Sequence, residues 1–174
     1  MMRSRSEVQA LVLRAARGAG LPPGHAEDVA QAAVAALSRD PACAGAIAAA
    51  LPAPAPAAFT VDGDRLHLAV TPVVWAGPMI RDALDAGAAR IAAAGVDCPA
   101  LLAAMLPDAR LTWTGADAIV QSAADPATPP VPRGQIDVDP TAWAAFEEMA
   151  ARTIVPETDL SRIAGAGAGV LDVD

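Results

Sequence analysis

Near the start of the chain, apolar and polar positions repeat with the spacing of an α-helix. Ser4 and Glu7 have the spacing of a capping box, and this run ends at Gly18 and Gly20. A second apolar stripe covers 26–37. The apolar positions of the two stripes are Val8, Leu11, Val12, Ala15, Ala26, Val29, Ala30, Ala33, Val34 and Leu37. The pattern predicts two helices that pack against each other.

A third, short helix is predicted from Asp40, an N-cap residue in front of Pro41, to Leu51. Residues 1–51 are therefore expected to form a helical part. The stretch 52–57 that follows alternates Pro with Ala, which is typical of an extended linker.

Beyond the linker the pattern changes to the alternation of a β-sheet. Residues 59–61 and 65–70 flank an Asp-Gly-Asp turn, which indicates a β-hairpin with one apolar face, and His67 lies on the other face. A second hairpin is predicted from 111–114 and 118–121, around a Gly-Ala-Asp turn.

Helices are predicted between and after the hairpins. Pro78 opens a long helix that Gly95 ends, and a shorter helix covers 99–106. A short strand at 135–138 precedes an Asp-Pro pair at 139–140, which begins an amphipathic helix.

These elements indicate an α+β fold, with an N-terminal helical subdomain followed by antiparallel hairpins covered by helices. At 174 residues we expect a single domain over 1–174. Within it, 58–155 would form the α+β part and 156–174 a C-terminal tail.

Composition narrows the classes of partner. The hydrophobic fraction of 54% is mostly Ala, so no run is apolar enough to span a bilayer, and the N-terminal residues lack the apolar core of a signal peptide. A cytoplasmic protein without membrane contact is expected. The formal net charge of −8, with no run of basic residues, argues against binding to nucleic acid.

Missing residue types exclude several kinds of chemistry. All 12 basic residues are Arg, and the chain has no Lys, Tyr or Asn, so a Lys Schiff base, a Walker A loop and a Tyr general acid are ruled out. Cys43 and Cys98 are far apart and are interpreted as buried thiols, and His25 as a solvated or capping residue. No metal site and no cofactor are predicted.

The C-terminal tail is the least ordinary segment. Gly165, Gly167 and Gly169 leave backbone amides unobstructed, and together with Ser161 and Arg162 they have the chemistry to bind a carboxylate or phosphate. Two alternatives stay open: a loosely docked terminus, and a tail that inserts into a neighbouring subunit or a protein partner.

Several stretches near the two ends of the chain form a recognisable set: 13–20 at the N-terminus, and at the C-terminus 150–156, the Ser-Arg-x-x-Gly-Ala-Gly-Ala-Gly motif at 161–169, and 172–174. In these stretches the chain resembles a family of small uncharacterised bacterial proteins that carry a domain of unknown function. The resemblance implies no activity.

Two hypotheses of function follow. The first is a binding or accessory protein, a homo-oligomer, that contacts a partner or a small anionic metabolite through its tail. The second is a cofactor-independent lyase, isomerase or hydrolase, in which His67 acts as a base and Arg162 holds a substrate carboxylate.

Overall fold

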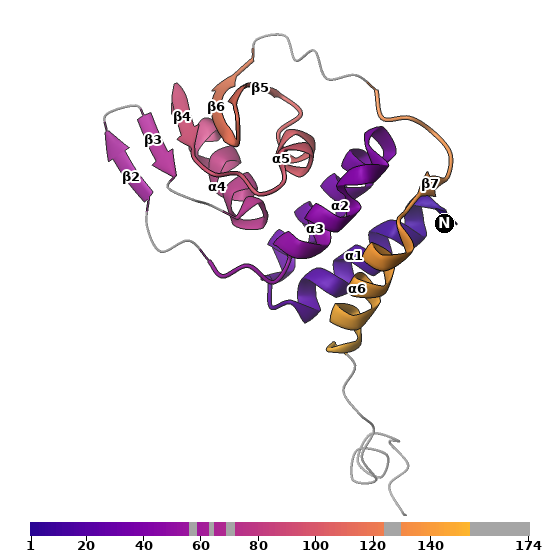
Figure 1. Cartoon of the computed structure of the whole chain (residues 1–174). Coiled ribbons are helices and arrows are strands. Elements are labelled where there is room, and N and C mark those ends of the chain that lie inside the picture. The colour runs from indigo at the N-terminus through magenta and orange to yellow at the C-terminus, as the bar shows by residue number, and fades with distance from the viewer. Residues whose placement is uncertain (56–58, 63–64, 69–71, 124–129, 154–174) are drawn as a thin grey trace, which may run out of the picture.

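The computed structural model describes residues 1–55, 59–62, 65–68, 72–123 and 130–153 (Figure 1). Within these ranges the fold has a helical part, built from both ends of the chain, and a sheet part, built from its middle. One helix of the helical part, α2 (Pro23–Arg39), also contacts the sheet part. The predicted α+β class is confirmed.

The helical part consists of α1 (Arg5–Gly18), α2 (Pro23–Arg39), the 3-10 helix η1 (Pro41–Cys43), α3 (Ala44–Ala50) and α6 (Pro140–Ala151). Helix α1 packs against α2 on one side and α6 on the other, and α6 also contacts α3. Beside them, strands β1 (Met2–Arg3) and β7 (Ile136–Asp137) form a short antiparallel pair that joins the two ends of the chain.

Local signals account for both ends of α1. The Ser4 hydroxyl accepts from the Glu7 amide at 3.2 Å, and the Ser4 amide donates to Glu7 Oε2 at 2.8 Å, so the predicted capping box is confirmed. At the other end Gly20 adopts a φ of 95°, and the Leu21 amide donates to the Ala16 carbonyl, as in a Schellman motif.

Small side chains let α2 lie between the two parts of the fold. Five of its eight buried residues are Ala. Because Ala extends so little from the backbone, α1 and α5 can both approach α2 closely. The Ala-rich composition therefore has a packing role in this helix.

The sheet part contains β2 (Phe59–Asp62), β3 (Arg65–Leu68), β4 (Arg90–Ala93), β5 (Ala109–Thr114) and β6 (Asp117–Ser122). Their order is β2-β3-β4-β6-β5, and only the β3–β4 pair is parallel. One face is buried beneath α4 (Val73–Asp85) and α5 (Pro99–Met105), as Figure 1 shows. The buried positions of that face include Leu66, Leu68, Ile91, Ala93, Ala118 and Val120.

The long helix predicted from Pro78 to Gly95 is wrong at both ends. Helix α4 begins at Val73, whose amide donates to Asp97 Oδ1 at 2.9 Å, and it contains Pro78 in its interior. It ends before Gly87, which has a φ of 94° in a second Schellman motif. The following residues form β4, the strand that joins the two hairpins.

The C-terminal elements also differ from the prediction. The strand expected at 135–138 exists as β7, but it pairs with β1 outside the main sheet. Helix α6 begins at Pro140 behind the predicted Asp139 cap, and it packs on α1 and α3 instead of covering a hairpin. The two ends of the chain therefore complete one helical layer.

The described end of the predicted linker contacts the sheet part, because the carbonyl of Ala53 accepts from Trp75 Nε1 of α4 at 3.0 Å. At the end of α6, Arg152 pairs with Glu148 at 3.3 Å. Among the described residues, no helix has the length and apolar character needed to cross a membrane.

Candidate functional site

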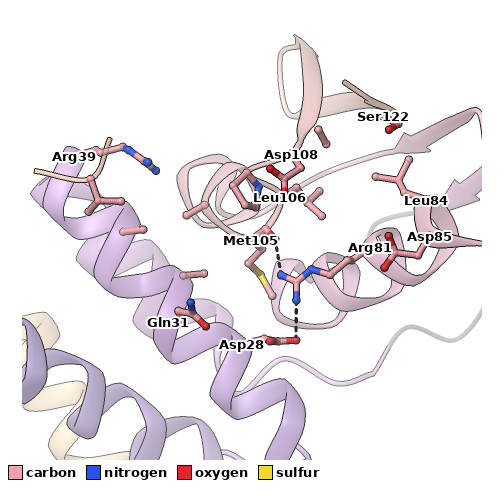
Figure 2. A pocket seen from close by; sticks show the side chains of 16 residues that line it. Asp28, Gln31, Arg39, Arg81, Leu84, Asp85, Met105, Leu106, Asp108 and Ser122 are labelled. Carbon is pink, nitrogen blue, oxygen red and sulfur yellow. Dashed lines mark hydrogen bonds and ion pairs between the residues drawn. The ribbon is translucent and has the colours of Figure 1, made fainter. Parts of the chain in front are cut away.

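A polar cavity of about 570 Å³ opens where α2, α4 and the end of α5 meet the start of β5. Figure 2 shows charged side chains around it that come from α2, from α4 and from the turn after α5. Its volume lies in the range of small-molecule sites, about 300 to 1,000 Å³. This cavity is the candidate functional site.

Arg81 of α4 contacts both of the other helices that line the cavity. One guanidinium nitrogen pairs with Asp28 Oδ2 of α2 at 3.3 Å, and the other donates to the Met105 carbonyl at 2.6 Å (Figure 2). Met105 is the last residue of α5, where a helix leaves carbonyl groups without an internal partner and carries partial negative charge. Arg81 therefore holds three helices in one arrangement.

Two further carboxylates belong to the cavity wall. Asp85 lies one helical turn after Arg81 on α4, and Asp108 lies in the turn between α5 and β5; both are exposed. Neither carboxylate has a hydrogen-bond or ion-pair partner within the described ranges. Of the five charged residues that line the cavity, three are acidic and two, Arg39 and Arg81, are basic.

Neutral groups complete the wall. Gln31 of α2 and Ser122 at the end of β6 contribute an amide and a hydroxyl, and Leu84, Leu106 and Met105 contribute apolar surface. The arrangement offers charged anchors beside apolar contacts, which is the usual character of a site for a small polar molecule. In the part of the chain that the structure describes, no group of three His, Cys, Asp or Glu residues is placed to hold a metal ion.

The candidate residues from the sequence lie elsewhere. His67 is exposed on β3, on the face opposite the buried Leu66 and Leu68, as the alternation predicts. It is not among the residues that line the polar cavity. The predicted anion-binding residues of the tail, Ser161, Arg162, Gly165, Gly167 and Gly169, lie outside the described residues.

The other titratable residues singled out in the sequence are held in the interior. Cys43 and Cys98 are buried and unbridged, as predicted. Burial raises the pKa of the Cys43 thiol to about 12 and also raises the pKa of Cys98, so both stay protonated at neutral pH. His25, interpreted from sequence as solvated or capping, is half-buried with its ring centroid 5.1 Å from that of Trp75.

The sequence pattern gives no indication of the cavity, because Asp28 and Asp85 lie outside the apolar stripes of their helices. The one available signal is the spacing of Arg81 and Asp85, which places both on one side of α4. Nothing local shows that this side faces α2, because the contact joins residues 53 positions apart (81 − 28).

Comparison with known proteins extends only to the N-terminal segment. Residues 3–40 match a family model described as Protein of unknown function (DUF3726). The resemblance of the N-terminus to proteins of unknown function is thereby confirmed, and the match spans α1 and α2, including Asp28 of the cavity. No curated protein and no solved structure matches the chain.

Proposed function

We propose that this protein is a small-molecule binding or accessory protein, and that its ligand occupies the cavity between α2, α4 and α5. The observation that carries the proposal is a cavity of about 570 Å³ whose wall presents two carboxylates, Asp85 and Asp108, that pair with no other described residue. A ligand with an amine or another basic group would pair with them. Apolar contacts with Leu84 and Leu106 would hold its carbon skeleton.

The Arg81–Asp28 pair stabilises the wall of the cavity but is not expected to be the main contact with the ligand. The Arg81 guanidinium already pairs with Asp28 and donates to the Met105 carbonyl, so few of its N–H groups remain for a ligand. We assign Arg81 a positioning role: it keeps the carbonyl end of α5 next to α2.

A thermal-shift experiment tests the proposal. The full chain is screened against small amines, amino acids, carboxylates and phosphates. An amine-bearing compound at 100 times its Kd should stabilise the fold by about 2.7 kcal/mol. Asp85→Asn and Asp108→Asn should each reduce this stabilisation.

Asp82→Asn is the matched control, because Asp82 is an exposed carboxylate on the same helix that does not line the cavity. It should leave the ligand-dependent shift unchanged. If no basic compound stabilises the wild type, or if Asp82→Asn removes the shift as fully as Asp85→Asn does, the cavity is not the binding site.

The remaining expectations from sequence stay proposals. We propose a cytoplasmic homo-oligomer. We also propose that it does not bind nucleic acid, which the net charge of −8 supports. Anion binding by the tail is a separate proposal, tested by loss of phosphate- or carboxylate-dependent stabilisation in Arg162→Ala. The enzyme hypothesis would place a base at His67, which is exposed and away from the cavity.

A further inference from the structure

The outer face of the five-stranded sheet, opposite α4 and α5, carries polar and small side chains in register. One row crosses all five strands and consists of Thr60, His67, Ala92, Ile119 and Thr112. All five are exposed or half-buried, and within the described ranges no helix covers this face. The described residues therefore leave this face uncovered.

A second row on the same face is basic. Asp62 pairs in register with Arg65, Arg65 with Arg90, and Gln121 with Arg110. The β4–β6 register places Arg90 opposite Gln121, so three of the five positions in this row are Arg. The Arg90 and Arg110 side chains are exposed, and their backbones are about 10 Å apart, two strand spacings.

This basic row contrasts with the rest of the sheet part. Its other Arg, Arg81, is paired with Asp28 on the opposite side of the sheet. The acidic residues Asp82, Asp85, Asp97 and Asp108 lie on α4 or in turns, outside the strands. Asp117, the acid at the start of β6, is engaged by the Gly95 amide at 2.8 Å. The row itself holds three Arg and one Asp, so it is basic although the whole chain carries −8.

A hollow of about 270 Å³ is lined by His67, Ala92 and Ile119 of the first row, by Arg90 of the second row, and by Leu66. Because the Ala92 side chain is short, the hollow has room for an apolar side chain of a partner. Arg90 also lines the hollow. The face therefore combines an apolar hollow with the guanidinium groups of the second row.

We infer that this outer face is a docking surface for an acidic, extended polypeptide segment of a partner protein. Carboxylates of the segment pair with Arg90 and Arg110, and an apolar side chain of the segment sits in the hollow beside Ala92 and Ile119. An Arg guanidinium binds a carboxylate well, because two of its N–H groups can donate to the two carboxylate oxygens.

Charge complementarity and residue type favour a polypeptide over a nucleic acid. Single-stranded nucleic acid binds to sheets largely by stacking bases on aromatic rings. At the outer positions of the described rows, His67 is the sole ring. A long polyanion would also extend beyond the basic row into the field of a chain with charge −8.

Fluorescence anisotropy with the full-length chain tests the inference. The probe is a labelled eight-residue peptide of alternating Glu and Val, and the matched peptide has Lys in place of Glu. We expect the Glu peptide alone to bind, more weakly as NaCl is raised. Arg90→Glu and Arg110→Glu should each weaken binding by about tenfold or more.

Arg133→Glu is the control, because Arg133 is exposed and lies outside the sheet; it should leave peptide affinity unchanged. Arg90→Gln, which keeps length and polarity, should give an intermediate loss and serves if the charge reversal does not fold. The inference is overturned if the wild type does not bind the Glu peptide, or if Arg133→Glu weakens binding equally.

Two other outcomes would also overturn it in favour of another occupant. If oligothymidylate binds with the same dependence on Arg90 and Arg110 while the Glu peptide does not, the face contacts nucleic acid. If the chain self-associates without peptide and Arg90→Glu abolishes that association, the occupant is a second copy of the chain.

Discussion

The helical part and the sheet part are held together by different kinds of contact. In the helical part α1 approaches α6 so closely that a Cβ on Gly18 would collide with the backbone carbonyl of Met149. In the sheet part the close approach of α4 to α5 at Gly77 is made against the side chain of Met105. A backbone contact cannot adjust, whereas a Met side chain has rotatable bonds. The adjustable contact also borders the cavity, because Met105 lines it.

The helical part and the sheet part therefore have distinct roles. The helical part provides a closely packed base, and its α1 and α2 are the segment similar to proteins of unknown function. The sheet part provides the basic outer face and, together with α2, the wall of the polar cavity. A substitution at the α1–α6 contact should therefore affect stability most, and one at the cavity or the outer face should affect ligand or partner binding most.

The largest effect is expected from Gly18→Ala. The added methyl group meets the Met149 carbonyl, which belongs to the backbone of α6, so the two helices must separate. We expect a loss of about 3 kcal/mol in the free energy of unfolding, measured by urea denaturation. Gly45→Ala in α3 is the control, because nothing lies near its Cβ position, and it should stabilise by about 0.5 kcal/mol. Equal effects of the two substitutions would refute the backbone contact.

A smaller effect is expected from Gly77→Ala in the sheet part. The new Cβ would contact the thioether of Met105, which can move aside, and Ala also favours the helix over Gly. We expect a net loss of about 1 kcal/mol in urea denaturation. Because Met105 lines the cavity, ligand-dependent stabilisation should also change. A loss as large as that of Gly18→Ala would remove the contrast between the two parts.

Arg81→Met tests how much the contacts of Arg81 with α2 and α5 stabilise the fold. The substitution keeps an unbranched apolar stem but removes the donors to Asp28 and to the Met105 carbonyl. The Arg81 side chain is 40% exposed, so solvent screens the pair, and we expect a loss of about 1 kcal/mol. Arg152→Met, which breaks the exposed pair with Glu148, should cost less than about 0.5 kcal/mol. Similar losses in the two variants would deny Arg81 its positioning role.

The smallest effect concerns Glu7, the partner of Ser4 in the capping box. Hydrogen bonds from the Ser4 side chain and backbone lower the pKa of Glu7 below its ordinary value of 4.5. A carboxyl with a lowered pKa stabilises the fold above the ordinary value, and that contribution disappears as the pH falls through the folded-state pKa.

Urea denaturation of wild type and Glu7→Gln at several pH values measures this contribution. The difference between them should be present at neutral pH and shrink as the pH falls below 4.5. A difference that is constant over this range would show that the charge of Glu7 has no part in the cap.

Most helix ends were predictable because their signals are local. The Ser4–Glu7 capping box, the Asp139 cap and the glycines after α1 each act within a few residues. The two hairpins were predictable for the same reason, since a short turn determines which strands pair.

The error over α4 and β4 shows where such signals compete. Residues 88–94 are mostly Ala, which continues a helical pattern by propensity. Gly87, in a left-handed conformation, follows the true end of α4, but in the sequence Gly95 is an equally good residue to end a helix. Strand β4 exists because β3 and β6 pair with it on both sides, and those contacts are distant in sequence.

By itself the sequence determined the class of the fold, most helix caps, both hairpins and the alternation that exposes His67, because each depends on neighbours within a few positions. Only the tertiary structure decided that α6 packs on α1, that Arg81 reaches Asp28, and that the Arg residues of three strands share one row. These arrangements depend on which elements bury their apolar faces together, and that choice is made by the packing of the whole chain.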